Sequence, residues 1–302
     1  MKRALIACAF ALAACGPEQG RAPARETGGV SAALTPVSLA AFFDCLRENE
    51  QTIVSAHRGG PEPGFAENAI ATFEHTLAQA PALLEIDVSR TRDGVLVLMH
   101  DDEVDRTTNG VGAVRDLTLA QVQALQLEDE DGEALDAHPP TLREALDWAD
   151  GRAVLELDVK RGVSYEEVAR EVRQAGAMDR VIFITYSLDG AARLARAAPE
   201  AFVYTNIASA GDLDALQRRG VDLTRIAAWL GDDQFDEDLV EALAARGVES
   251  RFGMFRSGSD FAGAAHAGIE SLAVNDVAEA FLQIDRVDGA EGYAALQCVS
   301  AP

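Results

Sequence analysis

The alternation of short apolar runs with amphipathic segments, from residue 53 to residue 284, constrains this fold more than any other feature. Apolar runs of about five to eight residues predict buried strands, and apolar residues spaced three or four apart predict helices. Regular alternation of the two indicates parallel strands joined by crossover helices. The predicted strands are residues 53–57, 83–90, 95–100, 153–160, 181–186, 202–207, 226–230, 248–252 and 271–275. The predicted helices are residues 69–79, 142–149, 165–175, 191–198, 213–219, 239–246, 261–267 and 277–284.

Two architectures can hold such a pattern, a closed barrel and an open doubly wound sheet. The open sheet usually carries a glycine-rich phosphate loop after its first strand, and this sequence has none there. Nine predicted strands are one more than a closed barrel needs, and the turn dipeptide Asp93-Gly94 separates two of them. One of the nine is therefore expected to be a short ribbon or an edge piece. We predict an α/β fold, a TIM (β/α)8 barrel over residues 37–302.

The N-terminus has the pattern of a targeting segment. Lys2 and Arg3 precede an apolar stretch over residues 4–14, which is typical of a signal peptide. The stretch ends in Leu12-Ala13-Ala14-Cys15, which resembles a bacterial lipobox, where cleavage leaves Cys15 to carry lipid. An ordinary signal peptide with an incidental cysteine is the alternative.

The segment that follows the predicted cleavage site points to the cell envelope. The residue after the predicted lipidated cysteine is Gly16 and not aspartate. This resembles the pattern of lipoproteins that are sorted to the outer membrane and face the periplasm. Residues 15–36 are rich in glycine, proline and alanine, which predicts a flexible lipid-anchored tether. No apolar run after the first fifteen residues is long enough to cross a bilayer. We therefore expect the membrane to be a partner through the lipid anchor alone.

Charge narrows the choice of partners. The formal net charge of −24 argues against nucleic acid and against anionic membrane surfaces, because both need clustered lysine and arginine. The same charge repels a phosphate group at long range, so any phosphate site must be locally positive. A bound divalent metal supplies such a charge. The sequence indicates no oligomeric state.

The four cysteines divide into two groups. Cys8 lies in the predicted signal peptide and Cys15 at the predicted lipidation site. Cys45 and Cys298 remain, near the two ends of the predicted barrel. In an oxidising compartment an even pair predicts a disulfide, and two free thiols are the alternative.

Charged and imidazole side chains lie at the ends of four predicted strands, where a barrel places its active site. On two of these strands the polar residues alternate with apolar ones, so they share one face. Buried acids need a partner or a metal, and converging carboxylates without matching arginines favour a hard cation, Mg²⁺ or Ca²⁺. Two histidines can then act as acid and base on either side of a phosphorus atom. The residues concerned are His57, Arg58, Glu85, Asp87, His100, Asp101, Asp102, Glu156, Asp158 and Lys160.

These motifs together resemble the glycerophosphodiester phosphodiesterase family, in its bacterial lipoprotein form. The matching motifs, in the order and spacing of that family, are His57-Arg58-Gly59, Glu67-Asn68, Glu85-x-Asp87, Asp93-Gly94 and His100-Asp101. Thr107-Thr108-Asn109-Gly110 also fits. The likeness is strongest over residues 54–109 and continues to about residue 277.

The resemblance implies a TIM barrel that hydrolyses glycerophosphodiesters to sn-glycerol 3-phosphate and an alcohol. It makes Glu85 and Asp87 metal ligands, with Asp158 as the third ligand and Glu156 as a further candidate. His57 and His100 become the acid and base pair. The family inserts a cap after the second histidine, and residues 103–140 look like that cap.

The predicted substrate site has four further residues. Arg58 and Lys160 supply positive charge for the phosphodiester, and the resemblance places Asn68 beside them. Trp229 ends a predicted strand and is a candidate to line the pocket, with core packing as the alternative.

The sequence departs from the family at two places. Asp158-x-Lys160 stands where the family usually has Glu-x-Lys, and Ala66-Glu67-Asn68-Ala69 reduces its Pro-Glu-Asn-Thr. Asp-x-Lys is similar to sphingomyelinase D-like enzymes. One alternative is therefore a phosphodiesterase of the sphingomyelinase D, lysophospholipase D or phosphatidylinositol phospholipase C kind, forming a cyclic phosphate on the same barrel. A non-catalytic envelope binding lipoprotein is the other.

Overall fold

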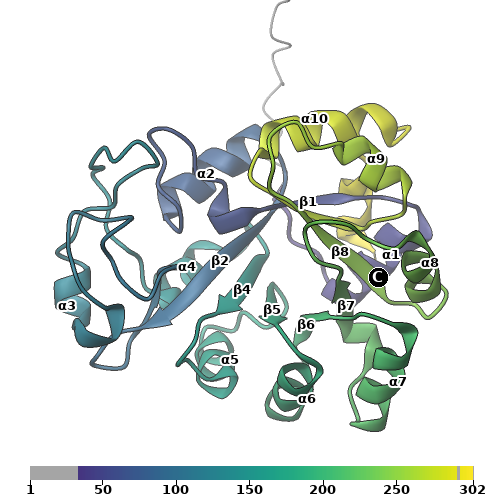
Figure 1. The fold of residues 1–302 in the computed structure, drawn as a ribbon, viewed down its shortest axis with the longest axis horizontal. Helices are drawn as coiled ribbons and strands as arrows, with labels where there is room; N and C mark the ends of the chain where they lie inside the picture. Colours follow the sequence, from purple (N-terminus) through teal and green to yellow (C-terminus); the bar gives the residue numbers. More distant parts are fainter. Residues whose placement is uncertain (1–32, 291–292, 302) are drawn as a thin grey trace, which may run out of the picture. The chain divides into compact units, whose positions relative to one another are not determined.

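The computed structural model describes residues 33–290 and 293–301, and eight parallel strands within them form a closed barrel (Figure 1). β1 pairs with both β2 and β9, and this closes the sheet. Nearly every strand residue is buried, because helices cover the outer face and side chains fill the interior. The predicted TIM barrel is thus confirmed. Its strands are β1 (Ile53–Ala56), β2 (Leu83–Arg90), β4 (Leu155–Val159), β5 (Val181–Thr185), β6 (Phe202–Asn206), β7 (Ile226–Trp229), β8 (Glu249–Met254) and β9 (Ser271–Val274).

The ninth strand is a ribbon outside the barrel. β3 (Leu96–Leu98) pairs antiparallel with β2, with Val88 opposite Leu98. The turn between them contains Asp93 and Gly94, and Gly94 has φ +85°, a backbone conformation that glycine adopts without steric cost. The expectation that one of the nine predicted strands is a ribbon at this turn is confirmed.

Helices follow the strands around the outside of the barrel (Figure 1). Two of them, α6 and α7, begin three residues before the predicted starts at 191 and 213. Ser187 Oγ accepts a hydrogen bond from the N–H of Gly190 and so begins α6 earlier. The first turns carry small and polar residues, which an apolar pattern does not detect. The helices are α2 (Ile70–Gln79), α4 (Leu142–Trp148), α5 (Tyr165–Gln174), α6 (Leu188–Ala197), α7 (Ala210–Arg218), α8 (Glu237–Ala244), α9 (Phe261–His266) and α10 (Val277–Val287).

One helix precedes the barrel and covers the N-terminal end of its strands. α1 (Leu39–Glu48) buries Phe43, whose ring stacks on Phe202 at the start of β6 with centroids 4.8 Å apart. Cys45 of α1 forms a disulfide with Cys298 of η4 (Ala294–Ser300), so the two ends of the domain are joined.

The domain begins earlier than predicted. Leu34, which the predicted tether of residues 15–36 contains, is fully buried in the core. The start at residue 37 is therefore too late by at least three residues. The predicted signal peptide, Cys15 and the rest of the tether lie outside the described residues. Among the residues that the structure describes, no helix is long and apolar enough to span a membrane.

The insertion after β3, predicted over residues 103–140, packs around its own small apolar clusters. It contains η2 (Val114–Asp116) and the four-residue α3 (Leu119–Val122), and isolated bridges such as Thr108 with Leu127. Val104, Val114 and Val122 form one cluster with Val97 of β3 and with Met99. The insertion extends from the barrel beside β2 (Figure 1).

Candidate active site

Three carboxylates converge at the C-terminal end of the barrel. Glu85 and Asp87 lie two residues apart on β2 and share a face, and Asp158 lies opposite Asp87 on β4. One oxygen of each carboxylate lies within 4.8 Å of the others, and all three residues are buried. The structure thus brings the three predicted metal ligands together.

The cluster fits a hard divalent cation. Burial, together with the charges of Asp87 and Asp158, raises the pKa of Glu85 well above its ordinary value. Asp158 Oδ1 is buried and has no hydrogen-bond partner within residues 33–290 and 293–301, which is costly for a carboxylate oxygen unless a cation binds it. All the donor atoms are oxygens, which Mg²⁺ and Ca²⁺ prefer. Glu85, Asp87 and Asp158 therefore have the charge and the ligand atoms to hold one such ion.

Lys160 lies beside the carboxylate cluster. Its Nζ is 2.6 Å from Asp87 Oδ1 and 2.5 Å from Asp158 Oδ2. Burial alone would lower the pKa of Lys160, but the two carboxylates outweigh it and raise the pKa. A fixed ammonium group thus lies against two of the three carboxylates.

His57 follows β1, and Asn275 fixes its tautomer. His57 Nδ1 lies 2.8 Å from Asn275 Oδ1, while Asn275 Nδ2 donates to the carbonyl of Phe255 at 3.1 Å. Because a carbonyl only accepts, the amide oxygen must face His57 and accept the proton of Nδ1. Burial lowers the pKa of His57, and the hydrogen bond to Asn275 offsets this only in part. The ring is therefore neutral at pH 7, with a lone pair on Nε2.

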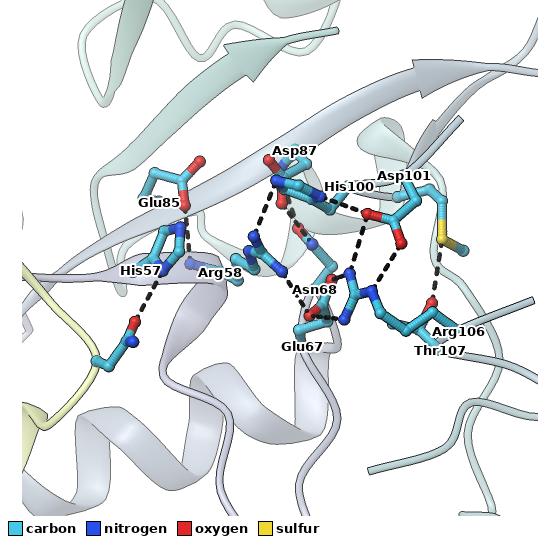
Figure 2. A network of polar contacts seen from close by, with 12 residues as sticks. His57, Arg58, Glu67, Asn68, Glu85, Asp87, His100, Asp101, Arg106 and Thr107 are labelled. Carbon is cyan, nitrogen blue, oxygen red and sulfur yellow. Dashed lines mark hydrogen bonds and ion pairs between the residues drawn. The ribbon is translucent and has the colours of Figure 1, made fainter. Parts of the chain in front are cut away.

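Arg58 connects the carboxylate cluster to the second histidine. Its N–H donates to Glu85 Oε2 at 2.8 Å, from a left-handed backbone with φ 54°. Its Nη1 donates to Glu67 at 2.9 Å, and its Nη2 to His100 Nε2 at 2.9 Å (Figure 2). The guanidinium is thus held between an acid and an imidazole.

His100 is oriented by an ionised carboxylate. Arg58 only donates, so His100 Nε2 accepts, and His100 Nδ1 gives its proton to Asp101 Oδ1 at 2.6 Å. Hydrogen bonds from Arg106 lower the pKa of Asp101 to about 2. Arg106 also donates to both oxygens of Glu67, at 2.8 and 2.9 Å (Figure 2). One arginine at the base of the insertion therefore positions the partners of both His100 and Arg58.

Asn68 differs from its predicted role in the substrate site. It is 3% exposed. Its Nδ2 donates to Asp87 Oδ2 at 2.7 Å, and its Oδ1 accepts from the N–H of Asp87 at 2.8 Å. Both ends of the amide are occupied, so Asn68 orients a carboxylate of the cluster and does not face a ligand.

Glu156, the further candidate ligand, lies outside the cluster. Its carboxylate is fully buried in the barrel and forms an ion pair with Arg251. It also accepts hydrogen bonds from Ser55 at 2.6 Å and Tyr204 at 3.2 Å. We leave Glu156 out of the ligand set for this reason.

Trp229 lies at the edge of a cavity of about 130 Å³ beside the cluster. A Cβ atom at Gly253 would lie 2.7 Å from atoms of both Trp229 and Phe255. Glycine at this position therefore lets both rings approach. The cavity is lined by His57, Glu85, Asp158, Ile184, Tyr186, Asn206, Trp229, Arg251, Phe255 and Ala273.

Among the residues of the site that were not predicted from the sequence are Arg106, Tyr186, Arg251 and Phe255. Arg251 had a signal, because the predicted strand 248–252 carries charged residues at two alternate positions, Glu249 and Arg251, which share one face. Tyr186 follows β5 beside Asp158, and burial and that carboxylate raise its pKa. Arg106 meets Glu67 across 39 positions of sequence, and no periodicity encodes such a contact.

The site lies at the C-terminal end of a TIM barrel, the usual place of the active site in that class of proteins. Three carboxylates that could hold a divalent cation meet there, with His57 on the cavity that Glu85 and Asp158 line. The family model described as "Glycerophosphoryl diester phosphodiesterase family" matches residues 57–277. The match covers more than half of the chain. The protein therefore belongs to the glycerophosphoryl diester phosphodiesterase family, as the motifs predicted.

Relatives in sequence match part of the chain. A glycerophosphodiester phosphodiesterase of Caldanaerobacter subterraneus is 34% identical over 144 residues, which are 45% of this chain and 59% of the relative. The rat glycerophosphodiester phosphodiesterase 1 is 38% identical over 114 residues, 37% of this chain and 34% of the relative. The chain thus spans less than two thirds of the length of either relative.

Solved structures match most of the chain. A glycerophosphoryl diester phosphodiesterase of Parabacteroides distasonis has 27% identity and a TM-score of 0.77, over 83% of this chain and 94% of its own. An Oleispira antarctica phosphodiesterase, solved with its product sn-glycerol-3-phosphate, has 22% identity and a TM-score of 0.63, over 79% of this chain and 99% of its own. The second likeness shows the shared fold.

Proposed function

We propose that this protein hydrolyses glycerophosphodiesters to sn-glycerol 3-phosphate and an alcohol, with a divalent cation as cofactor. The convergence of Glu85, Asp87 and Asp158 carries this proposal, and family membership supplies the substrate class. His57 lines the same cavity as Glu85 and Asp158. A cation held by these three residues would act as a Lewis acid on the phosphate. The −24 charge of the chain makes such a local positive charge necessary.

His57 is the proposed general base. Its ring is neutral, and the hydrogen bond to Asn275 leaves the lone pair on Nε2. This atom can accept a proton from the attacking glycerol hydroxyl, the one beside the phosphorylated carbon. The attack expels the alcohol and leaves a cyclic phosphate, which water then opens to sn-glycerol 3-phosphate. Phe255 packs on the ring with centroids 4.6 Å apart, so the imidazole is held in one orientation.

His100 is the proposed general acid. The ionised Asp101 accepts the proton of Nδ1 and so holds the ring in one orientation, with Nε2 facing away from Asp101. Nε2 of His100 accepts from Arg58 in this structure. In the substrate complex, the phosphate would take this donor from Arg58, and Nε2 could then bind a proton from water and pass it to the leaving alkoxide.

The histidines provide the first test. His57→Ala and His100→Ala are each expected to lower kcat by about 10² to 10⁴-fold, the usual contribution of an acid or base. His138→Ala, at an exposed position of the insertion, is the matched control and should keep full activity. Melting temperatures of all three variants should stay close to that of the parent. Full activity in both active-site variants would remove the proposed mechanism.

The metal and the substrate class are tested together. EDTA is expected to abolish hydrolysis of glycerophosphocholine, and added Mg²⁺ or Ca²⁺ to restore it. Lysophosphatidylcholine and sphingomyelin should react poorly, and phosphorus NMR should detect open sn-glycerol 3-phosphate as the end product. A cyclic phosphate end product would favour the sphingomyelinase D-like alternative. No turnover with any metal would favour a non-catalytic binding lipoprotein.

We also propose that the protein is an envelope lipoprotein anchored through Cys15, with the barrel in the periplasm. The proposal rests on the lipobox-like Leu12-Ala13-Ala14-Cys15, and the Cys45–Cys298 disulfide suits an oxidising compartment. Metabolic labelling with palmitate should mark the full chain and fail to mark Cys15→Ser. Labelling of the Cys15→Ser chain would contradict the anchor.

A further inference from the structure

A polar layer fills the barrel below the carboxylate cluster. Side chains from alternate strands share a level inside such a barrel. Ser55 of β1 and Glu156 of β4 each precede a site residue, His57 or Asp158, by two positions, so they lie one level nearer the N-terminal end. Tyr204 of β6 and Arg251 of β8 complete this level. All four are at most 4% exposed.

The guanidinium of Arg251 is fixed within this layer. Its Nη2 donates to Glu156 and, at 2.9 Å, to Ser55 Oγ. Its Cζ lies 4.7 Å from the centroid of the Tyr204 ring and 5.4 Å from that of the Trp229 ring. Ion pair, hydrogen bond and two aromatic faces together hold the group in one place.

Arg251 nevertheless keeps unused donors next to the reaction centre. A guanidinium has five N–H groups, and both hydrogen bonds above use Nη2. The Nε of Arg251 is buried and has no partner among the described residues. The same side chain lines the cavity that His57, Glu85 and Asp158 also line. A buried donor without a partner is rare, and the side chain that carries this one also lines the cavity.

We propose that Arg251 is a specificity-determining residue that donates a hydrogen bond to the terminal hydroxyl of the substrate's glycerol. This inference rests on the proposed function. With the phosphate at the cluster and the neighbouring hydroxyl at His57, the remaining carbon of glycerol extends into the cavity of about 130 Å³ toward Arg251. Trp229 and Phe255 form the apolar wall that the carbon chain would contact.

A pair of substrates that differ by one hydroxyl tests this assignment. Glycerophosphocholine is compared with the phosphocholine diester of propane-1,2-diol, which keeps the hydroxyl beside the phosphorylated carbon and lacks the terminal one. A site built to bind a hydroxyl rejects the analogue that lacks it. The parent protein should prefer the glycerol diester by at least about 100-fold in kcat/KM.

Variants then assign the discrimination to Arg251. Arg251→Met combined with Glu156→Gln removes both charges, because a single change would leave a buried charge unpaired. The double variant should lower this preference to less than about 5-fold, with the loss confined to the glycerol diester. Arg251→Lys keeps the charge beside Glu156 but lacks Nε and the planar fork. It should retain the melting temperature and still lose the preference.

A control double variant and a measurement of binding complete the test. Arg143→Met with Asp147→Asn repeats the change on an exposed pair of α4 and should keep the parental preference. Calorimetric binding of sn-glycerol 3-phosphate and of propane-1,2-diol phosphate does not depend on turnover. The assignment of Arg251 would be overturned if the parent protein turned over the two diesters equally and bound the two phosphates equally. An unchanged preference in Arg251→Lys would overturn it as well. Absence of any hydrolysis, with the binding preference intact, would instead overturn the proposed function alone.

Discussion

The two ends of the barrel both bury carboxylates, and they treat them in opposite ways. At the C-terminal end, Glu85, Asp87 and Asp158 face one another within 4.8 Å. At the N-terminal end, Glu249 is paired with Arg47 of α1 at 2.9 Å. The protein satisfies its charges with its own groups at one end and leaves a net negative charge at the other. The C-terminal end, where the carboxylates repel one another, is the end where a ligand would bind.

An ion pair, hydrogen bonds and a disulfide stabilise the N-terminal end of the barrel. Arg47 reaches Glu249 from α1, and both the N–H and Oγ of Ser250 donate to Glu270 at 2.7 Å. The disulfide at Cys45 holds the same helix. Changes at this end should therefore alter stability and leave catalysis unchanged, and changes at the C-terminal end should do the reverse.

The largest effect is expected for Asp158→Asn. Loss of one proposed metal ligand should lower kcat/KM by at least about 10³-fold, because metal catalysis contributes several kcal/mol. The melting temperature should stay the same or rise, because one of three mutually repelling carboxylates becomes neutral. Kinetics and calorimetry on one preparation measure both. A folded and fully active variant would contradict the prediction that changes at the C-terminal end of the barrel alter catalysis.

Removal of the disulfide should have the next largest effect. Cys45→Ala with Cys298→Ala is expected to lower the free energy of unfolding by about 2–5 kcal/mol. kcat/KM at 25 °C should stay within twofold of the parent, because the bond lies at the opposite end from the site. Urea unfolding of the parent and the variant gives the difference. Lost activity in a folded variant would show that the two ends are coupled.

Glu249 sets a pH dependence of stability. Burial raises its pKa to about 7, although the hydrogen bond from Arg47 opposes the shift. The folded state thus holds this proton more tightly than the unfolded state, whose pKa is 4.5. Stability associated with the proton is complete below pH 4.5 and is lost as pH rises through 7, by about 3 kcal/mol. Glu249→Gln should flatten this slope and raise the melting temperature at pH 8. An unchanged slope would contradict the assignment.

The smallest effect is expected for Asn68→Gly. Glycine keeps the left-handed backbone, where Asn68 has φ 57°, and removes both hydrogen bonds to Asp87. Loss of a group that orients a metal ligand usually costs 10 to 100-fold in metal affinity or activity. Titration of activity with Mg²⁺ measures the change. A shift in the Mg²⁺ requirement is expected, whereas a change only in melting temperature would reduce Asn68 to a structural role.

The sequence predicted the barrel and its carboxylate cluster because both follow from strand periodicity. Glu85 and Asp87 share a face since they are two apart, and Asp158 ends the next strand of the barrel. α1 was not predicted, although Leu39, Phe42, Phe43 and Leu46 have helical spacing, because it precedes the strand and helix alternation. The alternation along a strand thus predicts which of its side chains face the interior of the barrel.

The hydrogen-bond networks were less predictable. Asn68 was assigned to the substrate, and only the fold shows that its left-handed backbone turns the amide toward Asp87. Glu156 shares the inward face of Asp158, but its level in the barrel places it against Arg251. Loop conformation and barrel depth decide these contacts, and neither has a period in the sequence.

The bond between Cys45 and Cys298, which are 253 positions apart, makes the domain nearly a covalent ring. Machines that degrade proteins by threading a chain end through a narrow pore would pull against a loop instead of a single strand. A cut in any surface loop would leave both fragments attached. An oxidised copy of this protein should therefore outlast a reduced one wherever processive proteolysis, and not heat, is the threat.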